Sequence, residues 1–273
     1  MRWLIIGMVG AVLPASAIAQ APQPPPPPAP PQVWQLGSED NYCTVSTGNP
    51  TTAGLAVWMT PGDPKPDLIV IGSPNILPVV QDAFPTTVTL SPSRERFSAV
   101  VRDVAEDTHR RVLRLMHLKE AFPAVFTTSS EVRLEGMKQV IATVGSEKAI
   151  AALRQCIDDK LTEWGVDAKA YEALRMPATD PAPHLWFNRD DYPNEALAAR
   201  EQGDVIARMD LDQSGKVINC AVVVSSGAKS LDSFTCASAL KKGKFNPAIG
   251  ADGRPTASQR ILRMMWRIAP WSY

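Results

Sequence analysis

The side chains with the widest range of chemistry in this chain are four cysteines, Cys43, Cys156, Cys220 and Cys236. A thiol can bind a metal, act as a nucleophile or form a disulfide. The sequence contains no Cys-x-x-Cys pair, and no histidine lies close to a cysteine along the chain. Disulfides are therefore the favoured interpretation, with reactive or metal-binding thiols as the alternative, and four cysteines allow three pairings.

A second chemical candidate is Asp210-x-Asp212-x-Ser214-Gly215, which matches the beginning of a calcium-binding loop. An EF-hand loop needs a glutamate at its twelfth position. That position is Ala221, which lies within a predicted strand. The segment is therefore interpreted as a hairpin turn, and no metal site is predicted.

Motifs for catalysis are missing from the sequence. His109, His117 and His184 have no metal-ligand spacing, and Ser225-Ser226-Gly227 lacks the Gly-x-Ser-x-Gly pattern of a hydrolase nucleophile. No glycine-rich phosphate loop occurs. We therefore predict a protein that is not an enzyme and has no cofactor and no small-molecule substrate. A formal net charge of zero over 273 residues also argues against nucleic-acid binding.

Residues 1–19 match a secretory signal peptide. Arg2 supplies the positive beginning, Trp3–Val12 is apolar, and Ala17-Ile18-Ala19 matches a signal-peptidase site. An uncleaved anchor is the alternative, although a membrane span usually needs about 20 apolar residues. Residues 20–32 follow as a proline-rich linker, which would span on the order of 40 Å as polyproline II.

The last third of the chain carries the signals of a small antiparallel sheet. Asp204–Leu211 and Lys216–Val224 are predicted strands joined by the turn at Asp212–Gly215, and Ser258–Ile268 is a third predicted strand. A helix is predicted at Leu231–Lys241, and a shorter helix precedes the first of these strands.

This order of elements resembles the C-terminal domain of the TonB energy-transducer family. The resemblance covers roughly 80 residues and is carried by Tyr192-Pro193, Ala196-Leu197, Gly203-x-Val205, Asp212-x-x-Gly215-x-Val217, Ser225-Ser226-Gly227, Leu231-Asp232, Phe245-x-Pro247-Ala248, Gly253 and Trp266. It implies an α+β domain at 187–273 with two helices on one face of a three-stranded antiparallel sheet. It also implies a periplasmic domain that binds outer-membrane receptors and passes on force from an inner-membrane motor.

In this family the last strand lies at a sheet edge, where an extended receptor segment adds as a new strand. The resemblance and the alternation of the last strand together predict a partner-binding set of Tyr192, Pro193, Ile261, Arg263, Met265 and Arg267. Transducers often carry Gln-Pro-x-Tyr-Pro at the receptor contact. The sequence here departs from that pattern, because Arg189-Asp190-Asp191 precedes Tyr192-Pro193.

Residues 33–166 are predicted to form a disulfide-stapled α+β domain to which no role is assigned. Strands are expected at Leu55–Met59, Asp67–Ile71 and Thr86–Leu90, whereas Arg94–His117 fits either helix or strand. Ser146–Trp164 is predicted as a helix with one apolar stripe and with Ser146 as its N-cap. Residues 167–186, which contain Pro177, Pro181 and Pro183, are predicted as a linker.

The positions of the cysteines favour one pairing. Cys220 has the strand parity of Ile218 and Val222, and Cys236 lies in the helix expected to cover that sheet. Cys43 and Cys156 both fall in the preceding domain. We therefore predict the bonds Cys43–Cys156 and Cys220–Cys236, one within each domain.

Taken together, these features predict a non-catalytic periplasmic protein that binds an outer-membrane receptor or another envelope protein by strand addition, in association with transmembrane transport. One alternative is an inner-membrane transducer that retains Trp3–Ala19, although Ser16 is the only polar side chain in that segment. Another is a structural envelope protein whose last strand is covered. A homodimer through the edge strand is a further expectation, because unpaired edges pair with one another.

Overall fold

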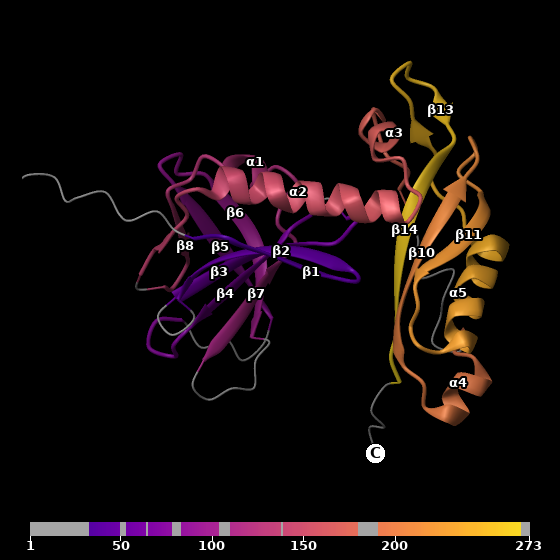
Figure 1. Cartoon of the computed structure of the whole chain (residues 1–273), viewed down its shortest axis with the longest axis horizontal. Helices are drawn as coiled ribbons and strands as arrows, with labels where there is room; N and C mark the ends of the chain where they lie inside the picture. The colour runs from indigo at the N-terminus through magenta and orange to yellow at the C-terminus, as the bar shows by residue number, and fades with distance from the viewer. Residues whose placement is uncertain are drawn as a thin grey trace, which may run out of the picture. The chain divides into compact units, whose positions relative to one another are not determined.

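The fold is described from a computed structural model for residues 33–49, 53–63, 65–77, 83–103, 110–137, 139–179 and 191–268. The predicted signal peptide, the proline-rich linker and residues 180–190 lie outside this described part. Within it the protein is α+β, with antiparallel sheets and two disulfides (Figure 1).

The first sheet has nine strands in the described chain, in the order β1-β2-β3-β4-β7-β6-β5-β8-β9. Strand β9 also contacts β3, which shows that the sheet is curled. Its strands are β1 (Gln35–Glu39), β2 (Tyr42–Asn49), β3 (Ala53–Met59), β4 (Asp67–Gly72), β5 (Phe84–Ser91), β6 (Arg96–Asp103), β7 (Arg111–Met116), β8 (Glu131–Leu134) and β9 (Ile141–Ala142).

The segment that fitted either helix or strand contains two strands, β6 and β7. On β6, Phe97, Ala99 and Val101 are buried, whereas the side chains between them are more exposed. This period of two is the signature of a strand with one face on a core. The helical spacing of the apolar residues in this segment was therefore misleading.

Two helices accompany the first sheet, α1 (Phe122–Phe126) and α2 (Ser146–Glu163), and the short helix α3 (Ala168–Glu172) follows α2 and contacts it. The apolar stripe of α2, which includes Ile150 and Leu153, is buried in the same hydrophobic cluster as the inner face of the sheet. Ser146 is not the N-cap of α2. That position is Gly145, whose φ of 84° suits glycine, and the Ser146 hydroxyl instead donates to the Phe126 carbonyl at 2.8 Å.

The second sheet has three strands in the order β11-β10-β14, formed by β10 (Gly203–Leu211), β11 (Val217–Val224) and β14 (Ser258–Trp266). Helix α5 (Lys229–Lys242) contacts β10 and β11, and the short helix α4 (Asn194–Ala199) contacts α5 (Figure 1). A two-stranded hairpin, β12 (Ala248–Ile249) with β13 (Pro255–Thr256), precedes β14.

The turn between β10 and β11 explains the calcium-like motif. One carboxylate oxygen of Asp212 accepts hydrogen bonds from the backbone N–H groups of Ser214 and Lys216 and from the Ser214 hydroxyl. These bonds close the hairpin. The hairpin interpretation of the motif is therefore correct.

Both disulfides join the cysteines that the sequence analysis paired. Cys43–Cys156 connects β2 to α2, with the two Cα atoms 6.2 Å apart. Cys220–Cys236 connects β11 to α5, with the two Cα atoms 5.4 Å apart. Each helix is thus bonded to a strand of the sheet on which it packs.

Residues 174–179 lie along the second sheet. Leu174 and Ala178 pack into the hydrophobic cluster of that sheet. The backbone of Met176 bonds with that of Ile249, and Thr179 bonds with Asn246. The chain is therefore held against the second sheet before it reaches residue 180.

Candidate functional site: the outer edge of strand β14

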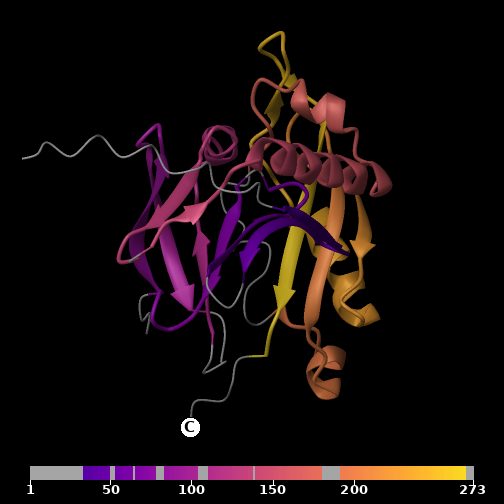
Figure 2. The same cartoon turned by 60° about the vertical axis from the view of Figure 1, so that its left-hand side comes forward.

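Strand β14 forms one edge of the second sheet, and β11 forms the other (Figure 2). β14 pairs with β10 over nine residues, from Ser258 opposite Leu211 to Trp266 opposite Gly203, without a register shift. The pairing of β11 with β10 has two register shifts. Bulges twist an edge away from further pairing, whereas a regular edge presents an even row of backbone N–H and C=O groups. β14 is therefore the better template for an added strand.

The side chains of β14 alternate between the helix-covered face and the outer face. Leu262 and Met264 pack against the hydrophobic clusters of the second sheet, and Trp266 is only 4% exposed. On the outer face Arg263 is exposed and Met265 is 62% exposed. The outer face thus offers an apolar side chain and a charged one at the second half of the strand.

Asp204 of β10 holds both predicted partner-binding arginines. Its carboxylate accepts hydrogen bonds from Arg263 Nη2 at 2.6 Å and from Arg267 Nη2 at 2.5 Å. Burial alone would raise the pKa of Asp204, but the hydrogen bonds and positive charges of the two arginines outweigh burial and lower the pKa. Because Asp204 lies directly opposite Met265 in the register, both guanidinium groups are held near that exposed methionine.

Tyr192 supports β14 from the helix-covered face. Its ring packs edge-on against the Trp266 ring, with the centroids 5.1 Å apart, and its hydroxyl donates to the Glu201 carbonyl at 2.5 Å. Burial is the main cause that raises the pKa of Tyr192. Pro193 is the N-cap of α4 and borders a hollow next to Phe234. The structure therefore places Tyr192 and Pro193 away from the outer-face side chains of Arg263 and Met265, although the Arg267 charge still acts on the Tyr192 hydroxyl and lowers its pKa in part.

Ile261 lies where the second sheet contacts the first. It is half-buried and packs against the hydrophobic cluster of the first sheet. Gly62, in the turn between β3 and β4, approaches so closely that a Cβ atom there would lie 2.6 Å from the Ile261 Cβ. We call this region the inter-sheet contact. Ile261 is thus covered by another part of the same chain.

Hydrogen bonds extend the inter-sheet contact along the first half of β14. The Gln259 amide accepts from the backbone N–H of Asp167 at 3.2 Å and donates to the Gly165 carbonyl at 3.3 Å. Arg208 of β10 donates to the Trp164 carbonyl at 3.0 Å. The end of α2 is therefore bonded to the sheet and covers the first half of β14, whereas in the second half Met265 stays 62% exposed among the described residues. We call this second half the open half of β14.

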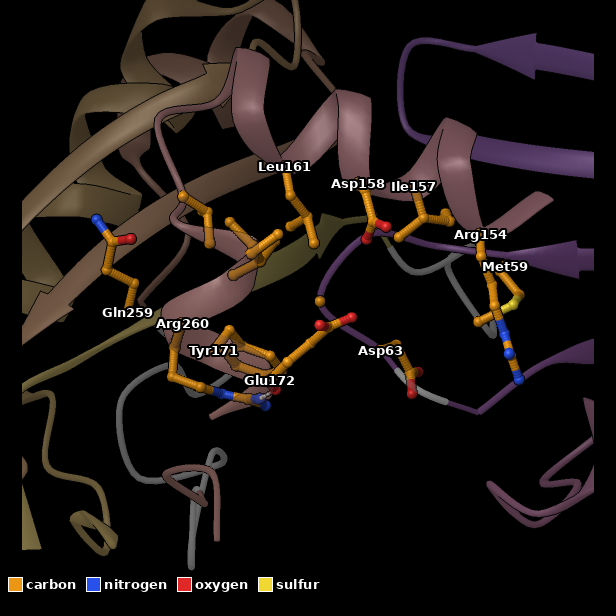
Figure 3. A pocket seen from close by; sticks show the side chains of 14 residues that line it. Met59, Asp63, Arg154, Ile157, Asp158, Leu161, Tyr171, Glu172, Gln259 and Arg260 are labelled. Atoms are coloured by element: carbon orange, nitrogen blue, oxygen red, sulfur yellow. Dashed lines mark hydrogen bonds between the residues drawn. The ribbon is translucent and has the colours of Figure 1, made fainter. Parts of the chain in front are cut away.

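A cavity of about 260 Å³ lies at the inter-sheet contact (Figure 3). Its apolar lining includes Leu161 of α2 and Ile261 of β14. Figure 3 shows Asp158 of α2 and Glu172 of α3 pointing toward each other across the cavity. Burial, followed by the negative charges of Glu172 and Asp159, raises the pKa of Asp158. Ionisation of Asp158 is therefore disfavoured at the inter-sheet contact.

A larger groove of about 670 Å³ borders β14 from Arg260 to Met265. Trp58, Asp67 and Arg114, from three strands of the first sheet, also line it. No local pattern in the sequence singles out these three residues. Alternation of apolar residues predicts a strand at Leu55–Met59. It gives no information about which distant strand the exposed face of this strand approaches in the folded protein. The sequence does not indicate a role for Asp204 either, because that role depends on which residues of β14 lie beside Asp204 in the folded sheet.

Among the described residues, no group of three or more His, Cys, Asp or Glu side chains is arranged so that it could hold a metal ion. None of the helices in the described ranges combines the length and apolar character needed to cross a membrane.

Comparison with known families gives a match, over residues 188–268, to the C-terminal domain of the Gram-negative bacterial TonB protein. The chain contains a TonB C-terminal domain. The matched range begins before α4 and includes β10, β11, α5 and β14. The TonB C-terminal family is a non-enzymatic, cell-envelope family associated with transmembrane transport. Neither curated proteins nor solved structures gave a match to the chain.

Proposed function

We propose that this protein is a periplasmic, non-catalytic binding protein that receives an extended segment of an outer-membrane receptor as an added strand on β14. Residues 187–273 would be the binding domain, with α4 and α5 as the two helices on its three-stranded sheet. The observation that carries the proposal is the contrast between the two edges of the TonB C-terminal domain. β14 is regular and open around Met265, whereas β11 carries two register shifts.

The charge on the edge favours a different chain over a second copy as the partner. Arg260, Arg263 and Arg267 all belong to β14 or directly follow it. Asp204 pairs with both Arg263 and Arg267, so its one carboxylate balances only one of these two guanidinium charges. Two copies paired through β14 would therefore bring net positive charge together, and like charges across a strand pair are destabilising. A receptor segment without this repulsion is therefore the better partner, and the homodimer is the alternative.

The proposal is tested by titrating the full chain with a synthetic peptide that carries the periplasmic N-terminal segment of a TonB-dependent receptor. Met265→Asp changes the open half of β14. Ile218→Asp is the matched control, because Ile218 is 59% exposed on the other edge strand. Met265→Asp should weaken binding by at least about tenfold, the scale of a single interface contact worth about 1.4 kcal/mol. Ile218→Asp should leave binding within about twofold.

Two results would overturn the proposal. Failure of every receptor peptide to bind would remove receptor recognition. A greater effect of Ile218→Asp than of Met265→Asp would move the added strand to β11. A structural role with β14 as a covered edge is the second candidate, because Ile261 is already packed against the first sheet. That role predicts no peptide binding and no effect of either substitution.

A further inference from the structure

The groove beside β14 has one wall from each sheet. Trp58 lies opposite Asp67 in the pairing of β3 with β4, and Ile69 lies opposite Arg114 in the pairing of β4 with β7. Because Asp67 and Ile69 are two residues apart on one strand, Trp58, Asp67 and Arg114 share one face of the first sheet. All three line the groove, together with Arg260 and Met265 of β14.

The indole of Trp58 is held in place by its neighbours. The Tyr42 ring packs against it with the centroids 4.2 Å apart. The Arg114 guanidinium lies 4.8 Å from the centroid of the Trp58 ring, and Arg114 is itself bonded to Asp67. The indole N–H is therefore a donor in a fixed position.

Two donors in the groove wall lack acceptors. Trp58 Nε1 and Arg260 Nε are buried, and neither has a hydrogen-bond partner among the described residues. The Arg260 side chain is anchored nearby, because its Nη1 donates to the Tyr171 hydroxyl at 2.8 Å. Buried N–H groups are nearly always paired in native proteins. An acceptor supplied by a ligand would pair these two donors from opposite walls.

The charged side chains that line the groove are of both signs. Arg114 is neutralised by Asp67, and Arg263 is neutralised by Asp204. Lys65 and Arg260 also line the groove, and neither makes an ion pair within the described part of the chain. Asp63 and Glu120 line the groove too and balance these two cations in number. Net charge therefore does not select the ligand, and a carboxylate would be held only where Arg260 can donate to it.

We infer that the first sheet forms the second wall of the binding groove and that this groove selects an extended segment carrying a carboxylate side chain. Trp58 and Arg260 donate to that carboxylate while the backbone of the segment pairs with the open half of β14. The inference rests on the proposed function, since it adds side-chain selection to strand addition. It also gives the first sheet a role in recognition.

The test begins with selection of randomised seven-residue peptides on the full chain. The best peptide is then synthesised with its acidic residue and with the corresponding amide, and both are titrated. Selected sequences should carry aspartate or glutamate at one fixed position. The acidic peptide should bind at least about tenfold more tightly than its amide counterpart, as expected for charge-assisted hydrogen bonds.

Two pairs of variants identify the donors. Trp58→Phe and Arg260→Gln each remove one unpaired donor and should reduce the preference for the acidic peptide to about threefold or less. Trp34→Phe is the control for the loss of an indole N–H, because Trp34 donates to Val144 at another place in the chain. Arg254→Gln is the control for the loss of an arginine, because Arg254 is exposed in the turn between β12 and β13. Both controls should retain the full preference.

The outcomes separate the two proposals. Peptides that bind in a Met265-dependent manner without a preference for an acidic residue would overturn the inference and leave the proposed function intact. A preference that survives both Trp58→Phe and Arg260→Gln would likewise overturn it. If no peptide binds the parent protein, the proposed function fails and the inference fails with it.

Discussion

Substitution of Gly62 by alanine should destabilise the protein by more than its backbone conformation requires. Gly62 has a φ of 83°, and a left-handed conformation costs an alanine roughly 1–2 kcal/mol. The new Cβ would also lie 2.6 Å from Cβ and 3.0 Å from Cγ1 of Ile261. Both atoms are close to the backbone of β14, so the overlap requires the two sheets to move apart. Overpacking of this kind typically costs about 1–3 kcal/mol.

Gly227 provides a matched control for the backbone cost. Its φ is 87°, and a Cβ added there would have no atom within 4 Å. Gly227→Ala should therefore lose roughly 1–2 kcal/mol of unfolding free energy, whereas Gly62→Ala should lose about 2–5 kcal/mol. The difference of about 1–3 kcal/mol isolates the overlap with Ile261 at the inter-sheet contact.

Urea unfolding of the full chain, followed by tryptophan fluorescence, measures both losses. A lower midpoint at an unchanged slope reports a change in stability. Equal losses for Gly62→Ala and Gly227→Ala would refute the reasoning, because they would show that Ile261 is free to move away from the first sheet without cost.

Three further predictions concern single bonds and charges. Replacing Cys220 and Cys236 by serine opens a link between residues 16 positions apart and should cost about 3 kcal/mol in urea unfolding, so a loss below about 1 kcal/mol would contradict the chain-entropy account. Asp204 has a lowered pKa, so its stabilising contribution is present above the ordinary value of 3.8 and is lost as the pH falls through the lowered pKa. Asp204→Asn should therefore be about 1 kcal/mol less stable than the parent at pH 7 and equal to it in strong acid, whereas a constant difference would exclude this role. Asp158 has a raised pKa, so its ionisation destabilises the fold as the pH rises through that pKa; Asp158→Asn should melt at a higher temperature than the parent at pH 7 and at the same temperature well below pH 3.8.

Much of the second sheet follows from its sequence, because its strands keep a strict alternation between turns. The alternation of β14 places Arg263 and Met265 on the outer face, as observed. In β11, simple alternation does not predict the face on which each side chain lies. A register shift places Asn219 opposite Asp210 and Val217 opposite Leu211. Ile218 is consequently exposed, although counting by two assigns it to the face of Cys220. A bulge changes the face of every residue beyond it and leaves little trace in a single sequence.

The first sheet was harder to predict, and so was its contribution to the site. The strands β1, β2, β8 and β9 are short or polar, so their apolar periodicity is weak. The covering of Ile261 depends on a turn at Gly62, which is distant in sequence and meets β14 only in the folded chain. Trp58 and Arg260 form one groove for the same reason. Local patterns predict which residues face outward, and tertiary packing decides what those residues face.

Strand addition should place the partner's backbone along the open half of β14. Hydrogen exchange of the full chain, measured with and without a bound receptor peptide, tests this claim most directly, because an added strand protects the backbone N–H groups of the edge with which it pairs. We predict that protection increases within Leu262–Trp266 of β14 and stays unchanged in Val217–Val224 of β11. Increased protection in β11, or a bound peptide that changes neither edge, would contradict the account.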